Sequence, residues 1–331
     1  PPVEGIDALL WWCAGLLAVT YLSFSVLSVL HQAWGARLGG HSAQRARIVS
    51  WREGFALVGV LVASVLPSTA GLGAATVVFA LLLAVGVALL LRAPQARAQR
   101  GDHAAPDPTH WRAPLATPAF RRLLAVYLVN GIAAAVPATL VLFFIRDRLQ
   151  LPAFEPLFLA SYFAAGALSM PLWVRLVARI GLARAWLAGM GLSVAAFVWA
   201  AALGAGDLAA FTLVCVASGA ALGADLALPG ALLAGVIHRA GHGTRMEGAY
   251  FGWWNFATKL NLALAAGLAL PLLALAGYEP GSRDPEALRA LTLAYCLLPC
   301  ALKLLAATLL WWMGVGPAGT DTELEPEGAR P

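Results

Sequence analysis

Nine long apolar segments, separated by short polar ones, constrain what this chain can fold into. Each is close to the ~20 residues that an α-helix needs to cross a bilayer core. Hydrophobic residues make up 60% of the 331 residues and charged residues only 12%, against about 25% in a soluble domain. The sequence therefore predicts an all-α membrane protein, with these spans: Ile6–Leu30, Trp51–Leu66, Gly71–Leu91, Leu123–Ile145, Glu155–Val177, Ala185–Leu203, Leu208–Ile237, Tyr250–Ala276 and Ala287–Met313.

Arginines are concentrated in alternate connections between the spans. Because basic loops stay on the cytoplasmic side, this predicts an N-terminus outside and a C-terminus in the cytoplasm of a cell membrane, which we expect to be a bacterial inner membrane. Arg146 and Arg148 are the exceptions to the pattern. The four clusters are Arg37, Arg45, Arg47 and Arg52; Arg92, Arg97, Arg100, Arg112, Arg121 and Arg122; Arg179 and Arg184; and Arg239 and Arg245.

A linker rich in Pro, Ala and Arg divides the spans into three and six. It covers residues 93–117 and lacks apolar periodicity, so we predict a cytoplasmic connector. Residues 1–92 would form a partial N-terminal bundle, residues 118–314 a six-helix bundle, and residues 315–331 an acidic cytoplasmic tail. Six helices are half of many secondary transporters, so three further helices are expected to precede the chain.

Polar side chains inside a span are expensive in lipid and usually face a cavity or a partner. Lys259 lies near the middle of its span, and Asn255 and Thr258 share its helix face at 100° per residue. With Trp254 beside them, they predict one wall of a hydrated cavity. The alternative is that Lys259 pairs with a carboxylate only to hold helices together.

Four further spans carry isolated polar groups. Asp225 is the only carboxylate deep in a span, and it could pair with Lys259, help to bind a cation, or be structural. Lys303 is expected to extend towards the interface. Asn130 would border a polar cavity or form an interhelical hydrogen bond, and His31 with Gln32 would shuttle protons or simply mark the interface.

No enzyme motif appears in the sequence. The chain has no GxSxG, Walker or HExxH pattern, its four cysteines show no CxxC spacing, and His238 and His242 have no third metal ligand nearby. We therefore expect no enzyme activity, no metal site and no cofactor. The pair Gly219 and Gly223 forms a GxxxG motif, which in lipid predicts close helix packing.

Two blocks of sequence resemble a known transporter family. One is TYLSFSVLSVLHQAWGARLGGHSAQRARIVSWREGFALVGVLVASVLP, residues 20–67, and the other is GADLALPGALLAGVIHRAGHGTRMEGAYFGWWNFATKL, residues 223–260. Both are similar to the glycoside–pentoside–hexuronide:cation symporters, the melibiose-permease branch of the major facilitator superfamily. The matching features are Ala33–Leu38, Arg52, Arg245-x-Glu247-Gly248 and Lys259.

The resemblance implies a twelve-helix fold of which this chain supplies helices four to twelve. It also implies symport of a sugar or glycoside, coupled to sodium or protons. We expect a monomer, and no nucleic-acid partner, because the charges lie in short clusters between apolar runs and form no basic patch. Lys259 and Arg52 match family residues near the solute and cation sites. Ser28 stands near the family's helix-four aspartate, so the coupling ion stays open, and a lysolipid carrier of the same branch is the rival interpretation.

Overall fold

The computed structural model describes residues 5–38, 41–93, 110–243 and 246–312. The predicted linker between residues 94 and 109, Arg245 and the predicted acidic tail lie outside these residues. The described part is helical, with the elements α1 Ile6–Leu38, α2 Ser42–Leu91, η1 His110–Arg112, α3 Ala113–Ala116, α4 Pro118–Phe143, η2 Phe144–Arg148, η3 Pro152–Phe154, α5 Glu155–Ile180, α6 Leu182–Ala201, α7 Leu208–Arg239, α8 Glu247–Leu275, α9 Pro285–Thr292, η4 Leu293–Leu297 and α10 Leu298–Trp312.

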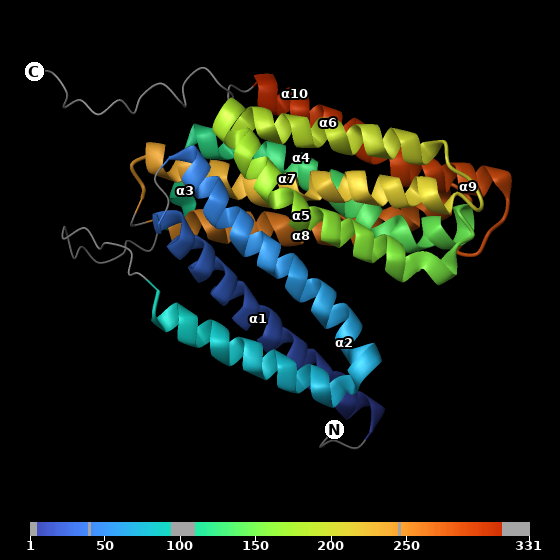
Figure 1. The fold of residues 1–331 in the computed structure, drawn as a ribbon, viewed down its shortest axis with the longest axis horizontal. Helices are drawn as coiled ribbons and strands as arrows, with labels where there is room; N and C mark the ends of the chain where they lie inside the picture. The colour runs from blue at the N-terminus through green and yellow to red at the C-terminus, as the bar shows by residue number, and fades with distance from the viewer. Residues whose placement is uncertain (1–4, 39–40, 94–109, 244–245, 313–331) are drawn as a thin grey trace, which may run out of the picture.

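The nine predicted spans are confirmed within the described residues. Two of them lie in α2, which divides into the spans Ser42–Pro67 and Thr69–Leu91. Gly71, at φ +83°, has a backbone conformation that suits glycine, and the preceding Pro67 cannot donate an intrahelical hydrogen bond. The chain turns back there, so the two spans run antiparallel (Figure 1). The helix starts earlier than the predicted span Trp51–Leu66, because α2 begins at Ser42.

Helix α7 is the centre of the six-helix bundle formed by α4 to α10. Its most apolar segment is 78% buried, whereas that of α1 has no buried residue. The GxxxG prediction is confirmed: Gly219 packs against the backbone of Tyr162, and Gly223 against Ser169 and the Gly166 carbonyl. Because neither glycine has a side chain, α5 and α7 approach each other closely at this crossing.

Gly219→Val is expected to weaken the bundle strongly. An added Cβ would lie 2.2 Å from the Tyr162 carbonyl oxygen, so two helix backbones would have to separate. Overpacking of this kind costs about 1–3 kcal/mol. The measurement is thermal unfolding in detergent, with Gly191→Val on α6 as a matched control, because a Cβ at Gly191 meets open space. Equal unfolding midpoints for the two variants would contradict this close contact.

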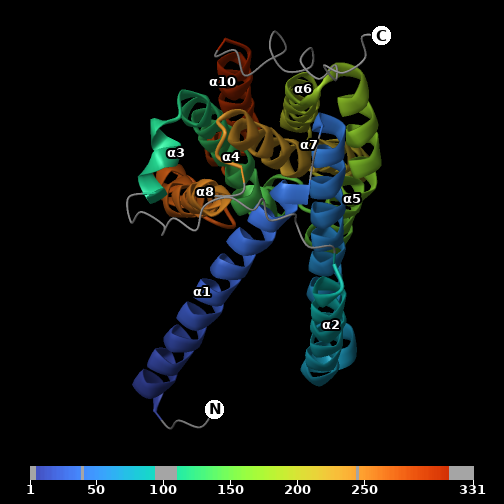
Figure 2. The same ribbon diagram turned by 90° about the vertical axis from the view of Figure 1, so that its left-hand side faces the viewer.

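Helices α1 and α2 contact the six-helix bundle at one end only. They meet it at the end where α3 lies and diverge towards the opposite end, near α9 (Figures 1 and 2). Residues 6–24 of α1 are almost all exposed in the described chain, and the buried residues of α2 lie between Ala46 and Leu57. The contacting end is therefore the end that carries the first arginine cluster.

At the opposite end, Asp147 ties the loop after α8 to η2. Its carboxylate accepts hydrogen bonds from the Tyr278 hydroxyl and from the Gly281 backbone N–H at 2.9 Å. The Arg283 guanidinium donates to the backbone carbonyl of Asp147. Burial, together with the Asp147 carboxylate, raises the pKa of Tyr278 well above its ordinary value. This end of the bundle is therefore closed by its own loop, independently of α1 and α2.

Candidate functional site

A buried network of charged and polar side chains joins four helices of the six-helix bundle. Lys303 of α10 forms an ion pair with Asp225 of α7 and donates to the Asn130 side-chain oxygen on α4 at 2.9 Å. The other Asp225 oxygen accepts from the Trp186 indole N–H at 2.9 Å and from the Asn130 amide at 3.1 Å. Lys303 is only 2% exposed and Asn130 3%, so the network lies away from solvent, at membrane depth.

One expectation about these residues is wrong, and one of the alternatives for Asp225 is excluded. Lys303 does not extend to the interface, and Asp225 does not pair with Lys259, because Lys303 occupies the carboxylate. Lys303 lies on the inward stripe of α10, with small side chains such as Cys300 and Ala306, whereas Leu304 and Leu305 face outwards. That alternation of small and large side chains was the one signal in the sequence that pointed to a buried lysine.

Every polar atom of the network has a complementary partner. Asn130 accepts from the ammonium with its carbonyl oxygen and donates to the carboxylate with its amide nitrogen, an orientation that satisfies both neighbours. Of its two expected roles, the interhelical hydrogen bond is present, because Asn130 bonds to Asp225 and Lys303; these two residues, and not Asn130, line the cavity described next. Such hydrogen bonds help a buried ion pair to be tolerated, because each ion loses its hydration on burial.

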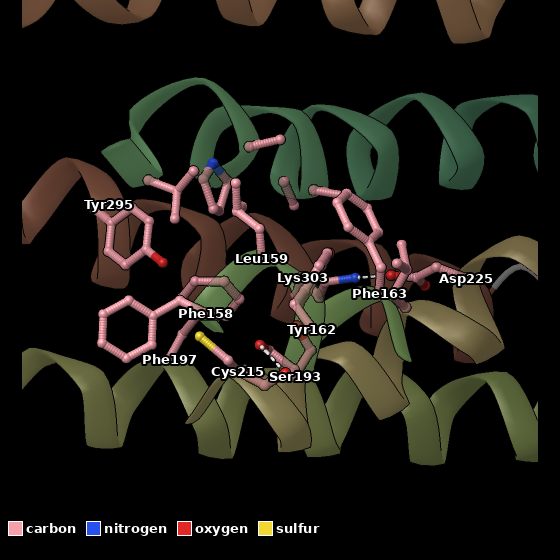
Figure 3. Close-up of a pocket in the computed structure, with 17 residues that line it drawn as sticks. Phe158, Leu159, Tyr162, Phe163, Ser193, Phe197, Cys215, Asp225, Tyr295 and Lys303 are labelled. Atoms are coloured by element: carbon pink, nitrogen blue, oxygen red, sulfur yellow. Dashed lines mark hydrogen bonds and ion pairs between the residues drawn. The ribbon is translucent and has the colours of Figure 1, made fainter. Parts of the chain in front are cut away.

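Two members of the network, Asp225 and Lys303, form one end of a cavity of about 130 Å³ inside the bundle. The cavity lies between α4, which packs mainly on α8 and α10, and α5 with α7. Figure 3 shows Asp225 and Lys303 at one end and the rings of Phe158, Phe197 and Tyr295 at the other. Further lining residues are Tyr162, Phe163, Ser193, Cys215 and Ser218. None of these was expected from the sequence, because an aromatic residue in a span does not reveal whether it faces lipid or a cavity.

The polar residues of α8 divide between two neighbours. Lys259 donates to the Ser25 hydroxyl of α1 and lies 5.8 Å from the centre of the Tyr21 ring. Asn255 also faces α1 and donates to Gln32 at 3.2 Å. The predicted common face is therefore only partly present, because Thr258 is turned towards α4.

Thr258 and Trp254 both contact Tyr127 of α4. The Thr258 hydroxyl lies 2.7 Å from the Tyr127 hydroxyl, and the Trp254 ring stacks on the Tyr127 ring with centroids 3.7 Å apart. These contacts are part of the packing of α4 on α8. Trp254 is 6% exposed, so it supports this wall and is not itself an open surface.

The remaining predicted residues lie where α1 and α2 meet the bundle. Arg52 forms a 2.6 Å ion pair with Glu53, and His31 makes an edge-on contact with Trp34 at 6.0 Å. Arg37 of α1 pairs with Glu247 of α8 at 3.2 Å, and Arg45 packs against Gly235 of α7. The two sequence blocks, residues 20–67 and 223–260, are thus brought into contact at this end.

The described residues contain no group of three or more His, Cys, Asp or Glu side chains that could hold a metal ion. Around Asp225, the neighbouring groups are N–H donors, which suit an anion or a proton acceptor and not a metal. The donors around Asp225 therefore suit ion pairing.

Comparisons with known proteins identify the architecture. The family model described as "MFS/sugar transport protein" matches residues 1–315. Among solved structures, a bacterial homologue of the iron transporter ferroportin in an outward-facing state is similar with a TM-score of 0.64 and 18% identity, over 94% of this chain and 74% of that one.

The E. coli fucose:proton symporter is also similar. One structure gives a TM-score of 0.56 with 14% identity over 85% of this chain and 73% of the symporter. A second, in the outward conformation, gives 0.55 with 12% identity over 85% and 72%. At these identities the likeness shows the fold, a helical bundle of the major facilitator type. No curated protein matches the chain.

Proposed function

Because this chain belongs to the MFS/sugar transport protein family, we propose that it is a secondary active transporter that moves a small solute together with a cation. The observation that carries this proposal is the Asp225–Lys303 pair, which is buried at membrane depth and borders a cavity. Charged residues at such depth are costly and are typical of solute and ion pathways. Transport would proceed by alternating access, with the two bundles rocking against each other.

The state adopted by the chain supports this mechanism. Helices α1 and α2 seal against α7 and α8 at the arginine-rich end, and they diverge at the other (Figure 2). If the arginine-rich loops are cytoplasmic, this is an outward-facing state. Two of the similar structures are described as outward-facing or in the outward conformation.

The seal at the arginine-rich end gives a direct test of this mechanism. Glu247→Gln is expected to open this end more often, because the Arg37 ion pair holds α1 on α8. Arg37 is 38% exposed and partly screened, so we expect an effect of about 1 kcal/mol, or about fivefold in the open population. The measurement is maleimide labelling of Ala234→Cys, a buried position of α7 beside Gln32 and Arg45, in a Cys13→Ser background.

Two controls accompany this labelling experiment. Glu279→Gln removes an exposed carboxylate in the opposite loop and is expected to leave labelling unchanged. The exchanged pair Arg37→Glu with Glu247→Arg is expected to restore protection. If Glu247→Gln labels at the rate of the parent protein, the ion pair does not hold this end closed.

The solute class is tested by uptake into proteoliposomes. With the full-length protein reconstituted, a sodium or proton gradient is expected to drive accumulation of a small solute, for which melibiose and fucose are the first probes. A pure exchange that no ion gradient drives would contradict cation coupling. Absence of any solute movement across a broad panel would contradict transport itself.

One observation favours an amphiphile carrier as the second candidate. A groove of about 670 Å³ lies between α4, α8 and α10, and its lining is aliphatic throughout, with residues such as Ile132, Leu268 and Leu297. An acyl chain would fit such a surface better than a sugar would. Uptake of lysophosphatidylcholine in the same vesicles, with melibiose uptake absent, would support this candidate over the first.

A further inference from the structure

Building on the proposed transport function, we propose that the Asp225–Lys303 pair is a proton-coupled anion site that binds the carboxylate group of the solute. In the empty state Lys303 holds the Asp225 carboxylate. When the solute arrives, its carboxylate replaces Asp225 on the Lys303 ammonium, and a proton from the medium binds to an Asp225 oxygen. The ligand is a small organic carboxylate with an apolar, ring-sized body.

The groups around Asp225 favour a proton over a metal ion as the partner of this carboxylate. Its neighbours are the Lys303 ammonium, the Trp186 indole N–H and the Asn130 amide, all of them donors. Hard cations such as Ca²⁺ require several oxygen ligands, and here the ammonium already occupies the position that such a cation would take. A proton needs no coordination shell and binds to the carboxylate itself.

Charge balance links the proton to an anion. Protonating Asp225 alone would leave a buried ammonium with only the Asn130 oxygen beside it, which is strongly unfavourable in a low-dielectric interior. Transferring the lysine proton to Asp225 would neutralise the pair with no net proton uptake. A solute carboxylate restores the pairing, so the site is neutral before binding (Asp⁻, Lys⁺) and after it (AspH, Lys⁺, solute⁻).

The other groups that face the pair do not supply this charge. From α4 and α5 the hydroxyls of Tyr127 and Tyr162 interact electrostatically with Asp225, and α6 contributes the neutral Trp186. From α2, Glu53 interacts with Tyr127 but is already paired with Arg52. The ammonium of Lys303 is thus the one positive group placed to receive an anion at the end of the described cavity.

The cavity defines the body of the ligand. At about 130 Å³ it is close in size to an engineered cavity that holds one benzene molecule. Its walls are the rings of Phe158, Phe163, Phe197 and Tyr295 with small residues of α4 such as Ala134, and the charged pair lies at one end (Figure 3). A single carboxylate on a ring-sized apolar group matches both features.

Proton uptake on ligand binding tests the proposal directly. The full-length protein in nanodiscs is mixed with benzoate in weak buffer containing a pH-indicating dye, and about one proton is expected to be taken up per benzoate bound. By reciprocity, benzoate affinity is expected to strengthen about tenfold for each pH unit lowered. Benzamide, the neutral counterpart of the same shape, is expected to cause no proton uptake. Myristate presents the same carboxylate from the bilayer. Proton uptake with myristate but not with benzoate would therefore show that the ligand enters from the bilayer.

The variant Asp225→Asn imitates the protonated carboxyl and provides the second readout. It is expected to bind benzoate with an affinity that no longer depends on pH and without proton uptake. Asp207→Asn, in the loop before α7, is the matched control and is expected to keep the parent's pH dependence. The wild-type measurement stands on its own if Asp225→Asn fails to fold.

Two results would overturn the proposal. One is that no carboxylate in the series causes proton uptake, and the other is that Asp225→Asn keeps the parent's pH dependence. If the same preparation then transports a neutral sugar, the proposed transport function still holds and only the proposed anion site is wrong. A preparation that takes up protons with benzoate but transports no solute would support the anion site and contradict the proposed transport function.

Discussion

Lys303→Met is expected to destabilise the protein by about 3–5 kcal/mol, because it leaves the buried Asp225 carboxylate without its ammonium partner. Trp186 and Asn130 still donate to the carboxylate, but neither carries a full charge. Methionine approximates the lysine stem in length, so the loss reports the ion pair and not a cavity. Thermal unfolding in detergent measures it, with a thiol-reactive dye that detects exposure of the buried Cys215, Cys296 and Cys300.

The double variant Lys303→Met with Asp225→Asn distinguishes a lost pair from a lost packing contact. Asparagine keeps an oxygen that can accept from Trp186 and carries no charge, so most of the lost stability is expected to return. If the double variant is as unstable as the two single losses added together, the two residues are not coupled.

The sequence predicts the helices far better than it predicts their contacts. Spans follow from apolar length alone, and all nine are present among the described residues. The pattern of polar and apolar residues along a helix does not show which face turns inwards, because lipid and protein core are both apolar. This is why Lys303 was expected at the interface, although it lies 2% exposed at the bundle centre.

The sequence also does not show which helices pack against each other. Spacing along α8 places Asn255 and Lys259 one turn apart, and both do face α1. Spacing could not show which basic residue reaches Asp225, because that depends on how α7 and α10 are rotated against each other. The π-helical turn η4 shifts the register just before α10, so periodicity could not be carried through the last span to Lys303.

Lys259→Ala is expected to abolish cation-coupled uptake by the full-length protein while membrane insertion survives. The side chain bridges α8 to Ser25 and Tyr21 of α1, at the end of the stretch of α1 that is almost all exposed, residues 6–24. Under the proposed rocking of the bundles this contact would change, and the Lys259 side chain is exposed. Removing the ammonium should therefore remove both a solute-attracting charge and a contact that depends on the conformational state.

Gradient-driven uptake in proteoliposomes measures this effect, with surface expression and thermal unfolding as checks on insertion and folding. Lys259→Arg keeps the charge and is expected to retain part of the uptake. Ser64→Ala, which removes a hydroxyl bonded only to its own helix backbone in the described contacts, is expected to behave as the parent protein. Because Lys259 is exposed and Lys303 is buried, loss of uptake without loss of stability in Lys259→Ala separates a role in transport from a role in folding. Normal uptake by Lys259→Ala would contradict a role for Lys259 in transport.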